Sequence, residues 1–427
     1  MTDPTLEKEL ERRRRRRQAA ETRFVWYGRA ALAIACTTLL AMLASILVSG
    51  VPALWQHEVQ LDIDWDRDAL GVPPGSLAAD LASANYPELV RRALAKEFPE
   101  VQERAAKREL NRLLSSGAAF DLQDLVLERP ARLGTQERIW LPLADDADML
   151  LKGKLTREGP ESERAVSDAQ IAWLDELDQR GRIERRFDFG FFTRGDSREP
   201  ELAGVGGALI GSLLTLALTL AICLPLGIAT AVYLEQFAPK NRWTDLIEVN
   251  INNLAAVPSV VFGLLGLAVF LNLFGVPRSA PLAGGLVLSL LILPTIIIAA
   301  RAALQAVPPS VLEAALAVGA SRMQAVGQHV LPLALPGIMT GTIIGMAHAL
   351  GETAPLLMIG MVAFIADVPG SAFDPATVLP VQVFLWADSP ERAFVDKTSA
   401  AIIVLLAFLV AMNLLAVVLR RRFEQRW

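Results

Sequence analysis

Six long runs without charge, or nearly without it, constrain the fold of this chain more than any other feature. They cover residues 30–56, 202–234, 249–277, 279–300, 330–366 and 398–419, and only His348 and Glu352 interrupt the fifth. Roughly 20 apolar residues span a bilayer as a helix, so each run is long enough to cross a membrane. A soluble protein could also bury apolar helices, but 53% of this chain is hydrophobic and these residues cluster in the runs. The sequence therefore predicts an all-α membrane protein with six transmembrane helices.

Basic residues beside the runs predict the orientation in the membrane. They are Arg12–Arg17 before the first run, Lys240 and Arg242 after the second, and Arg420–Arg422 and Arg426 after the last. Loops rich in lysine and arginine face the cytoplasm, so three separate stretches predict one topology with both termini cytoplasmic. The first arginine run could instead contact nucleic acid, but its place beside a span favours the topological interpretation, and we expect no nucleic-acid partner.

The same runs predict the domain organisation. We expect a charged cytoplasmic tail at 1–23, a first transmembrane helix at 24–56, an inserted domain outside the cytoplasm at 57–201, and a core of five spans at 202–427. The first apolar stretch is longer than the apolar region of a signal peptide and no clear cleavage site follows it. It is therefore predicted to be an uncleaved anchor.

The insert is long enough for a small α+β domain. Helical spacing over 86–117 and 167–181 predicts helices that stop at glycines. The β-favouring residues of 138–155 predict a short hairpin around a turn at Asp145 and Asp146. The insert contains neither cysteine of the chain and no recognisable catalytic or metal-binding group, so we expect no disulfide, cofactor or metal.

Two further stretches each allow two structural interpretations. Residues 378–386 are apolar but too short to cross the membrane, so we expect a re-entrant or interfacial helix with Trp386 at head-group depth. Asn250, Asn252 and Asn253 lie near the start of the third run. They could line a solute path or cap the end of a helix.

Between the fourth and fifth runs, residues 307–332 form two short helical patterns with a glycine between them. Ser310 stands three residues before Glu313, which is the spacing of a capping box, and Ser321 repeats the pattern. Gly319 fits the left-handed position that ends a helix. Small residues on the outside of such a helix-turn-helix would let another protein approach its backbone closely. The alternative is a helical hairpin that lies on the membrane without a partner.

This loop resembles the signature of ABC-importer permeases: Glu-Ala-Ala, three residues, Gly, nine residues, then Ile-x-Leu-Pro. The matching residues are Glu313, Ala314, Ala315, Gly319, Leu331 and Pro332, while His329 stands where the family usually has isoleucine. In that family the loop forms coupling helices that dock on the ATP-hydrolysing subunit, and the resemblance implies this role most directly for Glu313, Ala315 and Gly319. The chain has no Gly-x-x-x-x-Gly-Lys-Ser/Thr sequence. We therefore expect a transport subunit without an ATPase site of its own.

Glu352 lies inside the fifth run, where an ionisable residue is costly to insert and is a functional candidate by default. Gly351 leaves room beside it, and Pro355 disrupts the helix just after it. His348 lies one helical turn earlier on the same face, and it could pair with Glu352 when protonated. Glu352 could instead pair with a basic group from a neighbouring span or a partner permease.

If the solute that passes is an anion, its path also needs cationic groups or hydrogen-bond donors. Arg301, at the end of the fourth run, is one candidate, although it could equally be a cytoplasmic anchor.

Three segments resemble the A-type permease subunits of phosphate ABC importers. They are GETAPLL at 351–357, VPSVVFGLLG at 257–266 and LPTIIIAARAALQAVPPS at 293–310, and the resemblance covers about 202–427. The family often has arginine where this chain has His348. The resemblance implies the type I ABC importer permease fold, a place in the bacterial inner membrane, and translocation of inorganic phosphate into the cytoplasm.

The same resemblance implies partners: two copies of an ATP-binding cassette subunit, a second permease subunit, a periplasmic phosphate-binding protein and the lipid bilayer. The insert looks like the extra domain that some members carry. Two alternatives remain. The cargo could be another oxyanion or a small solute, or the chain could be a membrane receptor that senses a ligand through residues 57–201.

Overall fold

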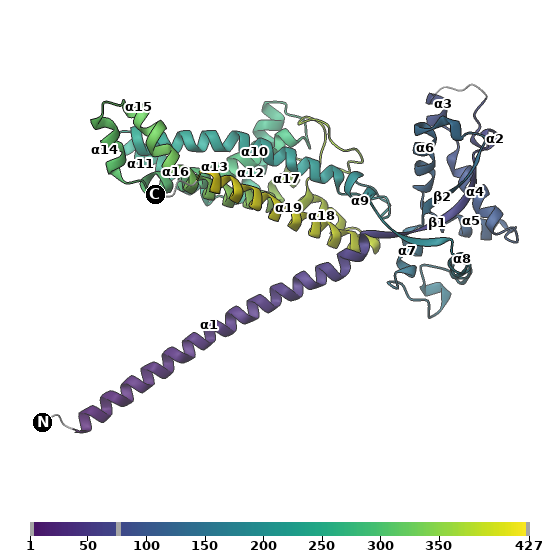
Figure 1. Ribbon diagram of the computed structural model, residues 1–427, viewed down its shortest axis with the longest axis horizontal. Helices are drawn as coiled ribbons and strands as arrows, with labels where there is room; N and C mark the ends of the chain where they lie inside the picture. The colour runs from purple at the N-terminus through teal and green to yellow at the C-terminus, as the bar shows by residue number, and fades with distance from the viewer. Residues whose placement is uncertain (1–3, 74–77, 424–427) are drawn as a thin grey trace.

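The computed structural model describes residues 4–73 and 78–423, so Arg426 lies outside the described residues. A bundle of long helices occupies one end of the molecule and a small α+β domain occupies the other (Figure 1). Both ends of the chain lie toward the end of the bundle that is remote from this domain. This architecture confirms the predicted fold class, an all-α membrane protein that carries an α+β insert.

The long helices account for most of the apolar runs. In the described residues, five helical spans are long and apolar enough to cross a membrane: Arg17–Ala53, Gly206–Phe237, Pro281–Gln305, Arg322–Gly351 and Ala393–Arg422. The elements of the bundle are α1 (Pro4–Ala53), α10 (Gly206–Val232), η3 (Tyr233–Phe237), α11 (Arg242–Ala255), α12 (Ser259–Leu265), η4 (Gly266–Leu273), α13 (Pro281–Gln305), α14 (Pro309–Ala317), α15 (Arg322–Ala325), η5 (Val326–Val330), α16 (Leu331–Gly351), α17 (Ala354–Met358), α18 (Leu379–Ala387) and α19 (Ala393–Phe423).

The third run, predicted as a span, is bent into two helical segments. Helix α11 and the segment Ser259–Leu273 meet at an angle of 104°, and only together do they pass as a sixth candidate span. Pro258 explains the break, because its ring prevents continuation of a helix and disfavours helical geometry in the residue before it. The N-cap of α11 is Asn241. Asn250, Asn252 and Asn253 therefore do not cap its start, and they lie exposed on its second half.

Close backbone contacts hold α13 and α16 together. Gly337, Gly341 and Gly345 recur every fourth residue along α16, so they share one face. A Cβ atom added to Gly337 or Gly341 would lie 2.7 or 2.1 Å from the methyl groups of Ala303 and Ala299 on α13. Small residues at such spacing let transmembrane helices pack closely without a hydrophobic driving force.

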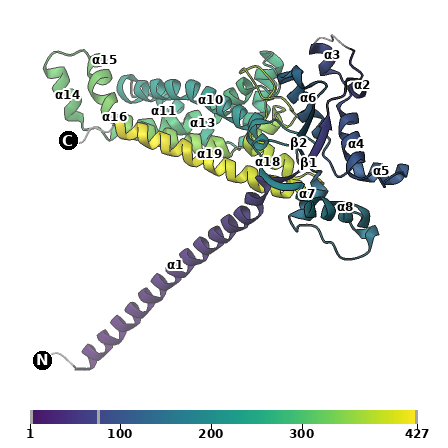
Figure 2. The same ribbon diagram turned by 45° about the vertical axis from the view of Figure 1, so that its right-hand side comes forward.

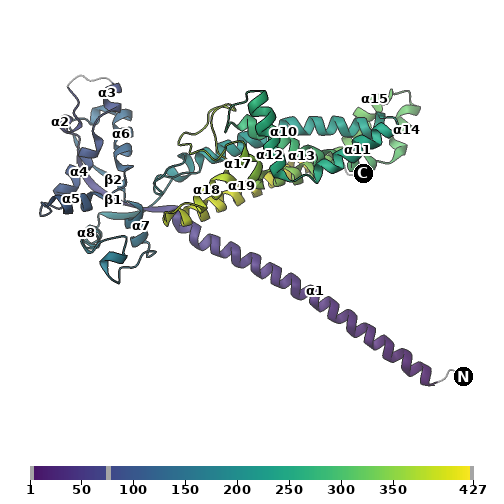
Figure 3. The ribbon, with the colours of Figure 1, turned by 180° about the vertical axis from the view of Figure 1, so that it is seen from behind.

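Helix α1 stands apart from the bundle. It diverges from the other long helices over most of its length, as all three ribbon views show (Figures 1–3). Its contact with α19 is at its C-terminal end, where a Cβ on Gly50 would lie 2.7 Å from the backbone nitrogen of Ala400. The large apolar residues of its first half, such as Phe24 and Trp26, are exposed. The predicted tail and first span thus form one continuous helix in the described residues.

The α+β domain follows α1 directly. Its elements are β1 (Trp55–Asp64), α2 (Arg67–Leu70), α3 (Ala78–Ala82), α4 (Tyr86–Glu97), α5 (Arg104–Asn111), α6 (Ala118–Glu128), η1 (Pro130–Arg132), β2 (Gln136–Pro142), α7 (Asp145–Leu151), η2 (Glu161–Glu163), α8 (Asp168–Gln179) and β3 (Ile183–Phe187), with α9 (Gly190–Thr193) leading to the bundle. The sheet order is β2-β1-β3, and both pairings are antiparallel. Val59, Leu61 and Ile63 alternate along β1 and are fully buried against the helices.

The predicted hairpin at 138–155 is wrong. The first half of that segment is β2, but the second half is helix α7, which begins at Asp145. The four residues Ala147–Leu150 are all buried, as expected for a helix packed against other elements and not for a strand with one exposed face. The partner of β2 is β1, which lies more than 70 residues earlier in the chain: Leu61 faces Ile139.

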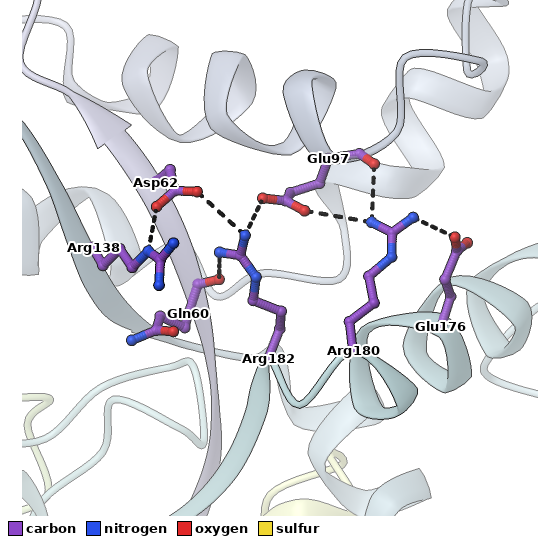
Figure 4. A network of polar contacts seen from close by, with 7 residues as sticks. All are labelled: Gln60, Asp62, Glu97, Arg138, Glu176, Arg180 and Arg182. Carbon is purple, nitrogen blue, oxygen red and sulfur yellow. Dashed lines mark hydrogen bonds and ion pairs between the residues drawn. The ribbon is translucent and has the colours of Figure 1, made fainter.

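A network of ion pairs links the strands of the domain to its helices (Figure 4). Arg182 contacts both Asp62 on β1, at 3.2 Å, and Glu97 on α4, at 3.4 Å. Arg138 on β2 binds the other oxygen of Asp62 at 3.0 Å, and Arg180 also contacts Glu97. Carboxylates and guanidinium groups alternate along the network, so each ion is next to opposite charges. The network therefore connects β1, β2, α4 and the start of β3.

Candidate functional site

The loop between α13 and α16 folds into the two short helices that the sequence predicts. α14 and α15 are joined through Gly319, whose φ of 92° lies in the left-handed region. The capping box of Ser321 is formed, because the Gln324 N–H donates to the Ser321 hydroxyl and the Ser321 N–H donates to the Gln324 side chain. The box predicted at Ser310 is not formed. α14 begins at Pro309, so Ser310 already lies inside the helix.

The loop has an inner face and an outer face of different character. Ala315, Ala325 and Val326 are buried where α14 packs against α15 and η5. Ala315 is thus a packing residue within the loop and not part of an outer docking face. The outer side carries Val318, which is 86% exposed, and Met323, which is 71% exposed.

The remaining residues of the signature lie around this outer face. Glu313, Ala314 and Gly319 are exposed, and Leu331 and Pro332 are half-buried at the start of α16. Large exposed apolar side chains at the tip of a loop are typical of a surface that binds another protein.

The fifth run is interrupted at Glu352. α16 ends at Gly351, Glu352 has an extended backbone with ψ of 120°, and the short helix α17 begins two residues later. The predicted fifth span is present as the helical segment Arg322–Gly351, and its helix ends one residue before Glu352 and four before Pro355, where the sequence predicted a disruption. Its interruption coincides with the one acidic residue in the run, which fits the general use of broken helices at transport sites.

His348 and Glu352 face each other on this break. The imidazole Nε2 and the carboxylate Oε1 are 2.7 Å apart, with side chains 58% and 20% exposed. The spacing of one helical turn accounts for the contact. The structure therefore brings together two of the predicted site residues, and the exposed imidazole is open to the outside of this single chain.

Gly351 and Pro355 shape the same region. A Cβ added to Gly351 would meet no atom within 4 Å, so the side of the break next to Glu352 is open. Pro355 packs against α12, where a Cβ on Gly263 would lie 2.7 Å from the Pro355 Cα. The break in α16 and the outer half of the bent α11–α12 pair are thus in direct contact.

Arg301 lies elsewhere. Its neighbours on α13, Ala299 and Ala303, pack against Gly341 and Gly337, which places Arg301 more than three helical turns of α16 from Glu352. Its guanidinium binds Glu248 on α11 at 2.8 Å and Glu235 on η3 at 3.5 Å. Arg301 therefore ties the last turns of α13 to η3 and to the middle of α11, toward the end of the bundle that carries the α14–α15 loop.

Several of these features were not identified from the sequence. Val318 and Met323 are ordinary apolar residues by type, and only the fold shows that they are exposed. Glu235 and Glu248 lie far from Arg301 in the chain and could not be paired with it without the bend in the third run. The glycine repeat of α16 was also not identified, although its four-residue spacing is typical of closely packed transmembrane helices.

Trp386 is enclosed by protein, while its depth in the membrane stays a prediction. Helix α18 is short, as expected, but the Trp386 ring is buried in the protein and its Nε1–H donates to Asp196 over 2.8 Å. It packs near Phe191 and Phe394 at the junction with the α+β domain. A tryptophan with its polar atom satisfied inside the protein is a packing residue.

Comparisons with known proteins bear on both parts of the chain. Residues 223–427 match the family model described as binding-protein-dependent transport system inner membrane component, and residues 11–161 match a domain of unknown function, DUF3333. The probable ABC transporter permease protein YqgI of Bacillus subtilis is 32% identical over 210 residues, which cover 47% of this chain and 71% of that protein. The phosphate transport system permease protein PstA 1 of Mycobacterium tuberculosis is 31% identical over 228 residues, which cover 53% of this chain and 73% of that protein.

The chain also superposes on a subunit of the MetNI methionine ABC transporter, with 19% identity and a TM-score of 0.39, over 52% of this chain and 95% of that one. In the described residues, five helical spans of membrane length, with a bent pair as a sixth candidate, define a multi-pass membrane protein. The chain belongs to the family of ABC transporter permease proteins, the inner-membrane components of binding-protein-dependent transport systems.

Proposed function

We propose that this chain is a permease subunit that translocates inorganic phosphate into the cytoplasm. The observation that carries the proposal is its similarity to relatives named as phosphate transport permeases, which are 31% identical over 228 and 239 residues. The family model of inner membrane transport components matches residues 223–427, which include the α14–α15 loop and the break at Glu352. The path for the anion passes the break, and Glu352 acts there as a gating group and not as a ligand, because a carboxylate repels phosphate. Gly351 and Pro355 keep the break open and fixed against α12.

The proposed orientation places both termini and the α14–α15 loop in the cytoplasm and residues 57–201 in the periplasm. Residues 1–23 form the tail, 24–56 the first span and 202–427 the transport core. This arrangement agrees with the arginines at both ends of the chain.

The energy comes from a separate ATPase, since this chain catalyses no chemistry itself. The importer contains two copies of that subunit, and one of them docks on the coupling loop of this chain at 307–332. Glu313, Ala314 and Gly319 lie exposed there beside Val318 and Met323. Leu331 and Pro332 transmit the movement to α16, and Ala315 keeps the two loop helices together. Arg301 holds η3, α11 and α13 together toward the cytoplasmic side. A second permease subunit and a periplasmic phosphate-binding protein complete the importer.

Uptake of labelled phosphate, sulfate and molybdate by cells with and without this chain tests the proposal. Loss of phosphate uptake alone is the expected result. Unchanged phosphate uptake with loss of another oxyanion would assign a different cargo. If no solute is lost but a transcriptional response disappears on deletion of 57–201, the chain is a receptor.

A further inference from the structure

A groove of about 270 Å³ runs between α10, α16 and α19, on the outside of the bundle. Leucine, isoleucine and methionine side chains form most of its wall, among them Leu220, Ile343, Met346, Met412 and Leu415. Thr342 also lines the groove, but its hydroxyl donates to the Ile338 carbonyl of its own helix over 3.0 Å. The groove therefore accepts an apolar occupant.

The length of the groove matches one leaflet of a bilayer. Its lining on α19 runs from Leu409 to Leu419, which at ~1.5 Å per residue is about 15 Å. The hydrocarbon core of a bilayer is ~30 Å thick, so the groove extends over about half of it. Its end at Leu419 is the end that carries the α14–α15 loop, which is the cytoplasmic end in the orientation proposed above.

Positive charge lies at that end of the groove. Arg420 follows Leu419, and its guanidinium donates to the Thr340 hydroxyl on α16 over 3.2 Å, so it reaches across from one wall to the other. Arg421 and Arg422 follow and are exposed. Within the described residues, no ion pair engages any of the three arginines. An apolar groove that opens at a basic cluster complements an acyl chain that ends in an anionic head group.

We propose that this groove binds one anionic phospholipid from the cytoplasmic leaflet, with an acyl chain along α19 and its phosphate at Arg420–Arg422. Every membrane lipid has acyl chains, so the groove alone does not discriminate between lipids. The arginines select the anionic ones. The occupied groove fills the space between α10 and α19 and supports the two helices that flank the broken span.

The test compares lipids with identical acyl chains on the purified full-length chain. Phosphatidylglycerol and phosphatidylcholine are titrated in detergent, and bound lipid is counted by native mass spectrometry. We expect at least tenfold tighter binding of phosphatidylglycerol. Equal binding of the two lipids would overturn the proposal.

Three variants separate the groove from a general surface charge. Replacing Arg420–Arg422 by glutamine should reduce phosphatidylglycerol binding about tenfold or more. Ala416→Phe keeps every charge but fills the groove, and it should reduce binding similarly. The matched control is Val418→Phe, which introduces the same side chain at an exposed position outside the groove lining and should leave binding unchanged. If only the arginine variant loses binding, the lipid is held by surface charge and the groove is not its site.

Helix α1 is the competing occupant, because its apolar face is exposed and it carries Cys36 on its surface. An Ala416→Cys variant in native membranes tests this directly. A disulfide between positions 36 and 416, within one chain or between two, would place α1 in the groove and overturn the lipid proposal. Absence of that crosslink together with selective phosphatidylglycerol binding supports it. Neither result depends on phosphate being the cargo.

Discussion

Two charged residues at the junction of the domain and the bundle show how local surroundings decide the behaviour of a single ionisable group. Lys397 at the start of α19 is buried, but Asp188 binds its Nζ at 2.9 Å. Glu201 lines the same small cavity and is only 6% exposed, yet its Oε2 has no hydrogen-bond partner. Burial raises the pKa of the Glu201 carboxyl to about 7. Lys397 therefore has a counter-ion at the junction, whereas burial favours the neutral form of Glu201.

Glu201 should therefore make the stability of the junction depend on pH. Its pKa in the folded protein, about 7, lies above the ordinary value of 4.5, so the folded state binds the proton more tightly than the unfolded state. The contribution of Glu201 to the free energy of unfolding is present in full below pH 4.5. It decreases by roughly 3 kcal/mol as the pH rises toward 7. Glu201→Gln should abolish this loss, as measured by thermal unfolding of the purified protein at pH 5 and pH 8. The exposed Glu199→Gln is the control, and an unchanged pH slope in Glu201→Gln would contradict the assignment.

Glu352 should matter for transport and not for folding. Glu352→Gln keeps the size of the side chain but removes the charge that faces His348, so phosphate uptake should fall by about tenfold or more, equivalent to ~1.4 kcal/mol on the transport barrier. The amount of protein in the membrane should not change. Asp388→Gln, on an exposed residue after α18, is the control for expression and handling. Full uptake by Glu352→Gln would make the carboxylate dispensable.

At the scale of elements, interruptions are as informative as continuous helices. The third and fifth runs are both broken, at Pro258 and at Glu352, and the two broken elements touch where Gly263 meets Pro355. The α14–α15 loop lies at the end of the bundle, between the two helices whose close packing is set by the glycine repeat. A displacement of the loop is therefore applied to α13 and α16 together.

Val318 provides a test of the loop as a docking element. Val318→Asp places a charge on the exposed tip of α14, where it costs the isolated chain little but cannot be buried against a partner without loss of binding. We expect about tenfold weaker co-purification of the ATPase, with normal amounts of the permease. The matched control is Val395→Asp, which changes an exposed valine at the N-terminal end of α19, remote from the α14–α15 loop. Normal ATPase binding by Val318→Asp would remove this face from the interface.

The sequence allowed some of these elements to be predicted and not others, for physical reasons. The thickness of the bilayer sets the length of an apolar run, and local hydrogen bonds form the Ser321–Gln324 capping box. Both features could therefore be predicted from the sequence. The bend at Pro258, the burial of Trp386 and the pairing of β1 with β2 depend on contacts between distant residues. The hairpin prediction failed for the same reason, because β2 pairs with β1 and not with the residues that follow it.

At the scale of the whole molecule, the α+β domain is fastened to the bundle at several points. Helix α1 passes into β1 through a single residue, Leu54. Lys154 near α7 binds Asp396 on α19 at 3.2 Å, and the buried pair of Lys397 and Asp188 lies beside it. The domain and α19 are therefore held by charge as well as by the chain itself.

Breaking the buried pair should loosen this attachment. Lys397→Met leaves Asp188 buried without a counter-ion, which should cost about 3–5 kcal/mol of stability, whereas adding Asp188→Asn should restore most of it. The more exposed pair offers the control, since Lys154→Met should cost less than about 1 kcal/mol. Limited proteolysis at the junction and thermal unfolding measure both effects. Equal behaviour of the two lysine variants would show that burial of the pair has no energetic consequence.

The pairing of β1 with β3 has a consequence for how such a chain could arise. Trp55, the first residue of β1, lies opposite Phe187, the last residue of β3, and their rings are in edge contact at 5.4 Å. Directly opposed residues on antiparallel strands have Cα atoms only about 5 Å apart. The segment between these two residues is more than a hundred residues long, yet its two ends lie close together in space. An ancestor could therefore have gained or lost it as one insertion without a change in the arrangement of the membrane helices.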